Sequence, residues 1–163
     1  MRFTLLVAFV LAFVAINASA QDEATKEQQK LQGTWKLQKL DIPDEGPRKY
    51  LEDNGRVIIK GNKVMFLVME KDEKIKMAEF TLKLDPSKTP RALDLAWDFL
   101  HLPSADKKAA EELKKLNGKT IPAIYSLEGD ALRIFANPDA KERPKVFPKK
   151  DGEGIIILKR EKP

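Results

Sequence analysis

The chain has 163 residues, enough for one domain with a hydrophobic core, and 30 Lys and Arg against 25 Asp and Glu give a formal net charge of +5. It contains no Cys, which excludes disulfide bonds, metal sites built on thiolates, and Cys nucleophiles. The single His excludes a polyhistidine metal site. We therefore expect no metal and no cofactor.

The first twenty residues have the features of an export signal. Arg2 gives a positive start, the run from Phe3 to Ile16 is apolar except for Thr4, and Ala18-Ser19-Ala20 has the small-x-small pattern that signal peptidase accepts. The run is shorter than the roughly 20 apolar residues of a membrane-spanning helix, which disfavours a membrane anchor. The sequence predicts cleavage after Ala20 and a secreted or periplasmic protein with no membrane span after cleavage.

The positive charge does not indicate nucleic-acid binding. Lysine pairs such as Lys107-Lys108 and Lys149-Lys150 are interspersed with acidic residues, and no aromatic side chains lie between them to stack on bases. We interpret the charge as that of a solvated exterior.

After the signal, residues 21–32 favour a short helix that ends before Gly33. The segments that follow alternate apolar and polar residues with the period of two that is typical of half-buried strands. Tight turns are indicated at Gly61-Asn62 and Gly129-Asp130. Eight strands are predicted, at residues 33–40, 56–60, 63–69, 75–84, 92–97, 120–127, 131–136 and 154–160.

One helix is predicted between strands, near residues 104–116, where Ser104 can cap its start and Gly118 can close its end. The other strands are not separated by the helices that parallel crossovers need. The sequence therefore predicts an all-β fold for residues 33–163: an eight-stranded up-and-down antiparallel barrel, with the short N-terminal helix and this one inserted helix.

The lengths of the connections predict two different ends. In an up-and-down barrel successive connections alternate between the ends. Three of the four connections at one end are long, residues 41–55, 98–119 and 137–153, whereas those at the other end are short. This pattern predicts a cup with an elaborated mouth and a plain base.

Several motifs together resemble one known family. They are Leu31-Gln32-Gly33-Thr34-Trp35-Lys36-Leu37, Leu82-Lys83-Leu84-Asp85-Pro86-Ser87-Lys88-x-Pro90, Ile124-Tyr125-x-Leu127-x-Gly129-Asp130-x-Leu132 and Glu142-Arg143-Pro144. They resemble a family of small secreted domains that is abundant in planctomycete bacteria and is described as lipocalin-like. The resemblance covers residues 31–159 and implies a barrel, but it implies no activity. The long insertion at residues 98–117 departs from the family, in which this connection is usually short.

Three residues also resemble the wider lipocalin pattern. In that superfamily a Gly-x-Trp on the first strand closes the base of the barrel, where the Trp stacks with an Arg from near the last strand. The resemblance implies that Gly33, Trp35 and Arg160 form the structural base of this barrel, with a cation–π pair between the last two.

Alternation counted from Trp35 places a set of apolar side chains inside the barrel: Leu37, Phe66 or Leu67, Phe80, Leu82, Leu93, Leu95, Tyr125, Leu132, Ile134, Ile156 and Leu158. From the aromatic residues of the predicted interior and mouth we select Phe80, Trp97, Phe99 and Tyr125 as candidate ligand-binding residues. Trp97 and Phe99 lead into the inserted segment, so they could line the mouth of the barrel or anchor the inserted helix.

We assign no catalytic residue and expect that the protein is not an enzyme. His101 alone has an ordinary pKa near neutrality, but no Gly-x-Ser-x-Gly motif supplies a nucleophile for it to activate. We interpret it as a structural residue. The acidic pairs Asp94/Asp98 and Glu111/Glu112 are interpreted as solvated charges.

Two functions remain open. The first is a secreted or periplasmic, monomeric, lipocalin-like protein that holds a small apolar ligand in the barrel, with Trp97, Phe99 and the inserted helix as a lid. The alternative is a protein-interaction module, an inhibitor or envelope scaffold, whose solid barrel binds an envelope protein through the long loops. An apolar cavity of about 300 Å³ or more favours the first, and close packing throughout favours the second.

Overall fold

The computed structural model describes residues 22–41, 45–100, 111, 115, 117–136, 142–148 and 154–162. The predicted export signal at residues 1–20, His101, Glu112 and most of the predicted helix near residues 104–116 lie outside the described residues. Within the described parts of the chain, no helix is long and apolar enough to cross a bilayer.

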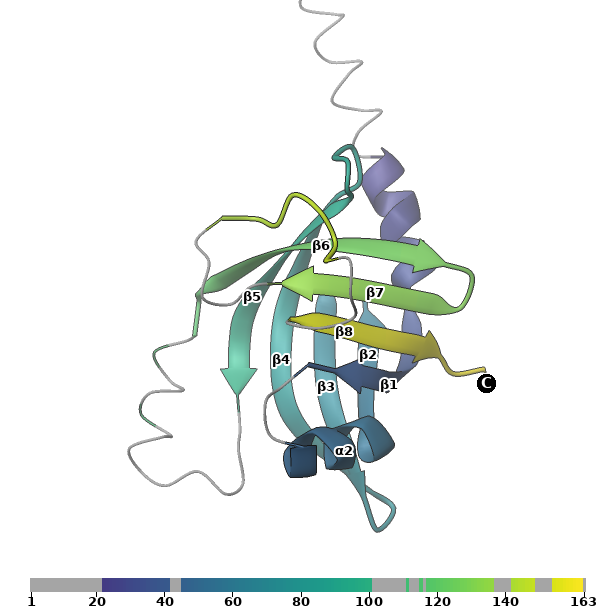
Figure 1. The fold of residues 1–163 in the computed structure, drawn as a ribbon, viewed down its shortest axis with the longest axis vertical. Helices are drawn as coiled ribbons and strands as arrows, with labels where there is room; N and C mark the ends of the chain where they lie inside the picture. Colours follow the sequence, from purple (N-terminus) through teal and green to yellow (C-terminus); the bar gives the residue numbers. More distant parts are fainter. Residues whose placement is uncertain are drawn as a thin grey trace, which may run out of the picture.

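Eight antiparallel strands form a closed barrel in sequence order, because β8 pairs with β1 (Figure 1). This arrangement confirms the predicted fold class. All eight predicted strands are present, with ends that differ by a few residues at most. They are β1 (Gly33–Leu40), β2 (Gly55–Lys60), β3 (Lys63–Glu70), β4 (Glu73–Asp85), β5 (Ala92–Leu100), β6 (Thr120–Glu128), β7 (Ala131–Ala136) and β8 (Ile155–Arg160).

The described residues include two helices outside the barrel wall. Residues 22–31 form the predicted N-terminal helix. A second helix, α2 (Glu45–Asn54), occupies the connection between β1 and β2, which was predicted to be a loop. Pro47 lies in the first turn of α2. N–H groups in the first turn have no acceptor within a helix, so the N–H that proline lacks costs no hydrogen bond there. At the end of α2, the side-chain Nδ2 of Asn54 donates to the backbone carbonyl of Tyr50 at 2.9 Å.

The described elements mark the two ends of the barrel. Figure 1 shows α2 and the turn between β3 and β4 together at one end, which we call the mouth. The N-terminal helix reaches the other end, the base, where Leu31 is buried in the same hydrophobic cluster as Trp35 and Tyr125. The long connection that contains α2 therefore lies at the mouth.

Three strands carry one extra residue relative to a neighbouring strand. The register of β1 with β8 skips Gln38, that of β4 with β3 skips Met77, and that of β5 with β4 skips Asp98. Such β-bulges bend a strand and reverse the inward and outward alternation beyond them. All three lie toward the mouth, so simple alternation describes the base more accurately than the mouth.

Arg143 ties the connection between β7 and β8 to the outside of the barrel. Its Nη1 donates to the carbonyls of Leu93 and Ala123 at 2.6 Å each, and its Nη2 lies 2.6 Å from the carboxylate of Asp94. The guanidinium therefore bridges β5 and β6, which gives the Glu142-Arg143-Pro144 motif a structural role. Asp94 is held in this ion pair.

Candidate functional site

A cavity of about 420 Å³ lies inside the barrel at the mouth. Every described residue that lines it is apolar. The lining comes from α2 and from all strands except β6: Leu37, Leu40, Leu51, Val57, Val64, Phe66, Met77, Ala78, Phe80, Leu95, Trp97, Ile134, Ile156 and Leu158. The cavity is larger than the volume of about 300 Å³ above which ligand binding is favoured.

The bulges help to shape this lining. Leu37 and Leu40 both face the cavity although they are three residues apart, because Gln38 is the extra residue between them. On β4, the adjacent residues Met77 and Ala78 both line the cavity, since the bulge at Met77 interrupts the alternation. Ala78 is buried with a side chain of only one carbon, which leaves space inside this part of the wall.

The base of the barrel, in contrast, is filled. Below the main cavity there is a space of about 30 Å³, close to the volume of one water molecule and too small for a ligand. Large side chains with almost no exposure line it, among them Leu31, Leu93, Leu132 and Leu158. The interior is thus divided into a hollow half at the mouth and a close-packed half at the base.

Two of the four candidate ligand-binding residues line the cavity. Phe80 and Trp97 face each other across β4 and β5, with ring centroids 4.3 Å apart and an interplanar angle of 47°. This pair forms an aromatic part of the wall. The structure therefore brings Phe80 and Trp97 together at the cavity, but it places Phe99 and Tyr125 elsewhere.

Phe99 lies on the outside of the barrel. The bulge at Asp98 reverses the alternation after Trp97, so Phe99 is opposite Glu79 and its ring is 39% exposed. Lys76 lies over this ring, with Nζ 5.0 Å from the centroid. Phe99 therefore does not share the inward face of Trp97, because strict alternation does not continue through a bulge.

Tyr125 belongs to the filled base and does not line the cavity. It is 1% exposed and packs in the hydrophobic cluster with Trp35 and Leu132. Burial raises the pKa of Tyr125 to about 12, and the negative charge of Glu27 adds to this rise. Alternation along β6 correctly predicts that Tyr125 points inward. Alternation does not show how far a residue lies from the mouth or the base.

The raised pKa of Tyr125 predicts a loss of stability at high pH. Below pH 10 the phenol is protonated in both folded and unfolded chains, so its contribution to stability is complete. As the pH rises from 10 toward 12, only the unfolded chain releases this proton, and stability should fall by about 2 to 3 kcal/mol. Denaturant unfolding of the wild type and of Tyr125→Phe between pH 9 and 12 measures this difference. An identical pH dependence in both proteins would contradict the prediction.

Gly33, Trp35 and Arg160 meet at the base. The Arg160 guanidinium carbon lies 4.1 Å from the Trp35 ring centroid, and Nη1 donates to the Gln32 carbonyl at 2.6 Å. Arg160 also donates to the carbonyl of Lys30 at the end of the N-terminal helix. A Cβ atom at residue 33 would lie 3.2 Å from Arg160 Nη1, and the φ of 124° there favours glycine.

The N-terminal helix is fastened to the base by a second contact that sequence reasoning did not find. Glu27 is only 3% exposed, and its carboxylate lies 2.6 Å from Lys30 Nζ and 3.0 Å from Arg91 Nη1. Arg91 immediately precedes β5, so this ion pair joins residues far apart in the sequence. A helical spacing relates Glu27 to Lys30, but the sequence has no signal that identifies Arg91 as the second partner.

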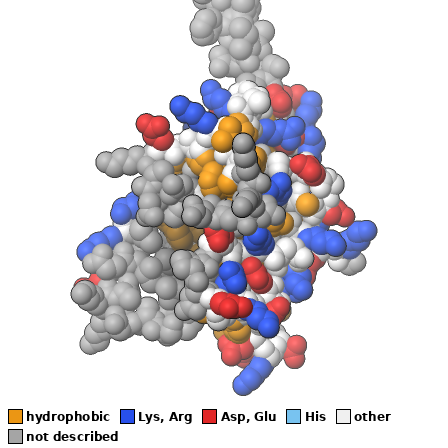
Figure 2. All heavy atoms as spheres, in the orientation of Figure 1, with side chains coloured by type: hydrophobic (Ala, Val, Ile, Leu, Met, Phe, Trp, Pro, Cys, Tyr) orange, Lys and Arg blue, Asp and Glu red, His pale blue; other side chains and the backbone are white. Residues whose placement is uncertain are grey.

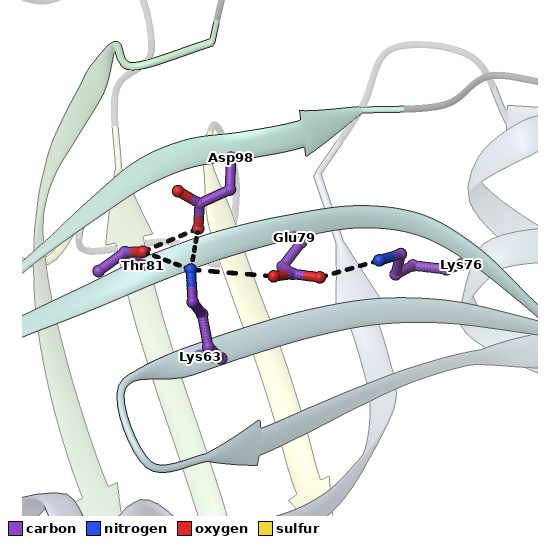
Figure 3. Close-up of polar contacts among 5 residues, drawn as sticks. All are labelled: Lys63, Lys76, Glu79, Thr81 and Asp98. Carbon is purple, nitrogen blue, oxygen red and sulfur yellow. Dashed lines mark hydrogen bonds and ion pairs between the residues drawn. The ribbon is translucent and has the colours of Figure 1, made fainter.

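The acidic residue Asp98 forms part of a polar cluster on the outside of β3, β4 and β5 (Figure 3). The Thr81 hydroxyl donates to Asp98 at 2.8 Å and Lys63 Nζ lies 3.0 Å from the same oxygen. The hydrogen bond from Thr81, together with Lys63, lowers the pKa of Asp98. Asp94 and Asp98 thus bind different partners, which is not the arrangement of a pair of catalytic carboxylates.

The exterior has a mixed charge. Figure 2 shows Lys and Arg side chains interspersed with Asp and Glu over the visible described surface. Within the described part of the chain, no group of three or more His, Cys, Asp or Glu side chains is placed to hold a metal ion.

Comparisons of this chain with models of protein families, with curated proteins and with solved structures find no match. The resemblance to the lipocalin-like family of planctomycetes therefore stays a prediction from the sequence motifs.

Proposed function

We propose that this protein binds a small apolar ligand inside its barrel. The observation that carries the proposal is the cavity of about 420 Å³, whose described lining residues are all apolar. This volume lies within the range of roughly 300 to 1,000 Å³ that is usual for ligand pockets. The alternative function assumed a solid barrel, and the hollow half of the interior argues against it.

The chemistry of the lining favours a hydrocarbon-like ligand. Of the lining residues that the structure describes, only Trp97 has a side-chain N–H or O–H group. A polar ligand group that entered the cavity would leave its hydrogen bonds to water without finding matching partners, at a cost of about 1 to 3 kcal/mol for each group. Each buried methylene would instead contribute about 0.8 kcal/mol in favour of binding.

A fluorescence titration tests the proposal directly. Trp97 lines the cavity and Trp35 is buried in the base, so a bound brominated fatty acid, which quenches only near contact, should quench mainly Trp97. We expect saturable quenching in the wild type and much weaker quenching in Trp97→Phe. Organic extraction of the purified protein should also yield a bound apolar compound. Neither quenching nor uptake of any apolar probe, together with an extract free of apolar compounds, would rule out the proposed function.

A homologous series of primary alcohols tests the apolar selectivity. When the alcohols displace the fluorescent polyene cis-parinaric acid, each added methylene should tighten binding about fourfold, the equivalent of about 0.8 kcal/mol, until the cavity is full. Diols of equal length that must bring both hydroxyls into the cavity should bind at least about tenfold more weakly. Binding that is independent of chain length would contradict this prediction.

A further inference from the structure

The pairing between β1 and β2 covers only part of β1. The two strands pair only from Gly33 to Lys36 on β1, opposite Ile59 to Arg56 on β2. β1 continues to Leu40 at the mouth, whereas β2 begins at Gly55. The mouth half of β1 is therefore hydrogen-bonded to β8 on one side and has no partner residues on β2 on the other.

Helix α2 lies beside the half of β1 that is not in register with β2. The backbone N–H of Leu40 donates to Glu52 Oε1 at 3.0 Å, so a side chain of α2 accepts the bond that a neighbouring strand would otherwise accept. One turn of the helix also supplies Leu51, the residue of α2 that lines the cavity. A helix thus completes the wall of the cavity where the β-sheet does not.

The attachment of α2 is shallow compared with that of the strands. None of the residues of α2 is fully buried. Each of the eight barrel strands, in contrast, contains at least one buried residue. Tyr50, next to Leu51, is 45% exposed. Segments with little buried apolar surface open locally at a much lower free energy than the whole fold. Displacement of α2 would leave all the ladders of the barrel intact.

The joint between α2 and β2 is fixed. Gly55 pairs with Val68 on β3, and a Cβ atom at this position would lie 2.3 Å from the Leu51 carbonyl oxygen and 3.1 Å from Phe66 Cε2. The chain is therefore anchored in the sheet at Gly55, immediately after α2 ends. Any displacement of α2 must pivot about this residue.

We propose that α2 is the movable wall of the cavity: the ligand enters and leaves by displacement of α2, which Leu51 closes from inside and Glu52 holds to β1. This inference rests on the proposed function for its ligand, but the movement of α2 is a property of the protein alone. It differs from the lid expected from the sequence, which was Trp97, Phe99 and the inserted helix.

A single introduced thiol measures the opening of α2 without any ligand. The chain has no Cys, so Leu51→Cys gives a unique reactive group whose rate of reaction with a soluble disulfide reagent reports its exposure. Adding Glu52→Ala should accelerate the reaction about fivefold to tenfold, because the bond to Leu40 is lost. Adding Glu52→Gln, which keeps an acceptor oxygen, should restore a rate close to that of the single variant.

Stopped-flow kinetics with cis-parinaric acid measures the same movement as ligand exchange. In Glu52→Ala we expect faster uptake and faster release by a similar factor, and therefore a dissociation constant within about threefold of the wild type. Glu52→Gln should behave like the wild type. The matched control is Glu79→Ala, which removes a carboxylate that pairs with Lys63 and Lys76 outside the barrel and should leave both rates unchanged.

The possible results separate the two proposals. Thiol and exchange rates that do not respond to Glu52→Ala, in a variant whose melting temperature shows that it is folded, would overturn the assignment of α2 as the movable wall. Faster thiol reaction without faster exchange would also overturn it, because the ligand would then use another route. If no apolar probe binds to the wild type, the proposed function fails, while the thiol measurement still shows whether α2 opens.

Discussion

Replacing Ala78 with Phe is expected to weaken the binding of an apolar probe at least about tenfold. Ala78 lines the cavity and is only 3% exposed, so the added benzyl group has space only in the hollow half of the interior. It would occupy volume that several methylene groups of a ligand need, and each lost methylene contact costs about 0.8 kcal/mol. The melting temperature should be unchanged or higher, because filling a cavity adds contacts. Competition with cis-parinaric acid measures the affinity.

The matched control is Ala131→Phe. Ala131 starts β7 at the base, opposite Glu128, and it does not line the cavity. This variant should retain the affinity of the wild type. If Ala78→Phe binds the probe as tightly as Ala131→Phe, the binding site is not the cavity described above.

Replacing Trp35 with Ala is expected to destabilise the protein by about 3 to 5 kcal/mol, the usual cost of truncating a large buried aromatic side chain. Trp35 is fully buried, donates from Nε1 to the Leu31 carbonyl at 3.0 Å, and supports the guanidinium of Arg160. Its loss would loosen the N-terminal helix as well as the base of the barrel. Denaturant unfolding followed by circular dichroism measures the change, and the melting temperature should fall by about 10 °C or more.

Trp97→Ala is the matched control, because it truncates the same kind of side chain at the wall of the hollow half. Trp97 is partly exposed and borders a space that already exists, so we expect less than half the loss seen for Trp35→Ala. Equal losses would show that the base and the mouth contribute alike to stability.

Arg160→Lys should not preserve the base, since an ammonium cannot match the planar guanidinium that reaches both Trp35 and two carbonyls.

The sequence predicts the barrel well because its strands alternate clearly and its hairpins are strongly marked. Gly61 and Gly129, for example, adopt positive φ values in tight turns between neighbouring strands. The short sequence of α2 has no such signal. It contains Gly46 and Pro47, and only Tyr50 and Leu51 are large apolar residues, so no helical stripe is visible. The contact of α2 with β1 determines which side of the helix faces the barrel, and the sequence of the helix alone does not show this side.

The candidate site is predicted less completely than the barrel. Phe80 and Trp97 are correctly placed inside, since alternation holds up to Trp97. Phe99 lies on the outer face because of a bulge, which is a relation between two strands and leaves no mark on the sequence of one of them. Tyr125 lies inside, as alternation predicts, but away from the cavity, because periodicity gives the face of a residue and not its height along the barrel. The volume of the cavity depends on the whole set of facing side chains and is not readable from any single segment.

The separation between a close-packed base and a hollow mouth has a consequence for how this scaffold can be altered. Side chains such as Leu51, Met77 and Ile156 border open space, so larger or differently shaped replacements there meet little steric resistance. Trp35 and Arg160 secure the fold at the opposite end. A library randomised at the first group and constant at the second would therefore vary in molecular recognition while most members retained a stable scaffold.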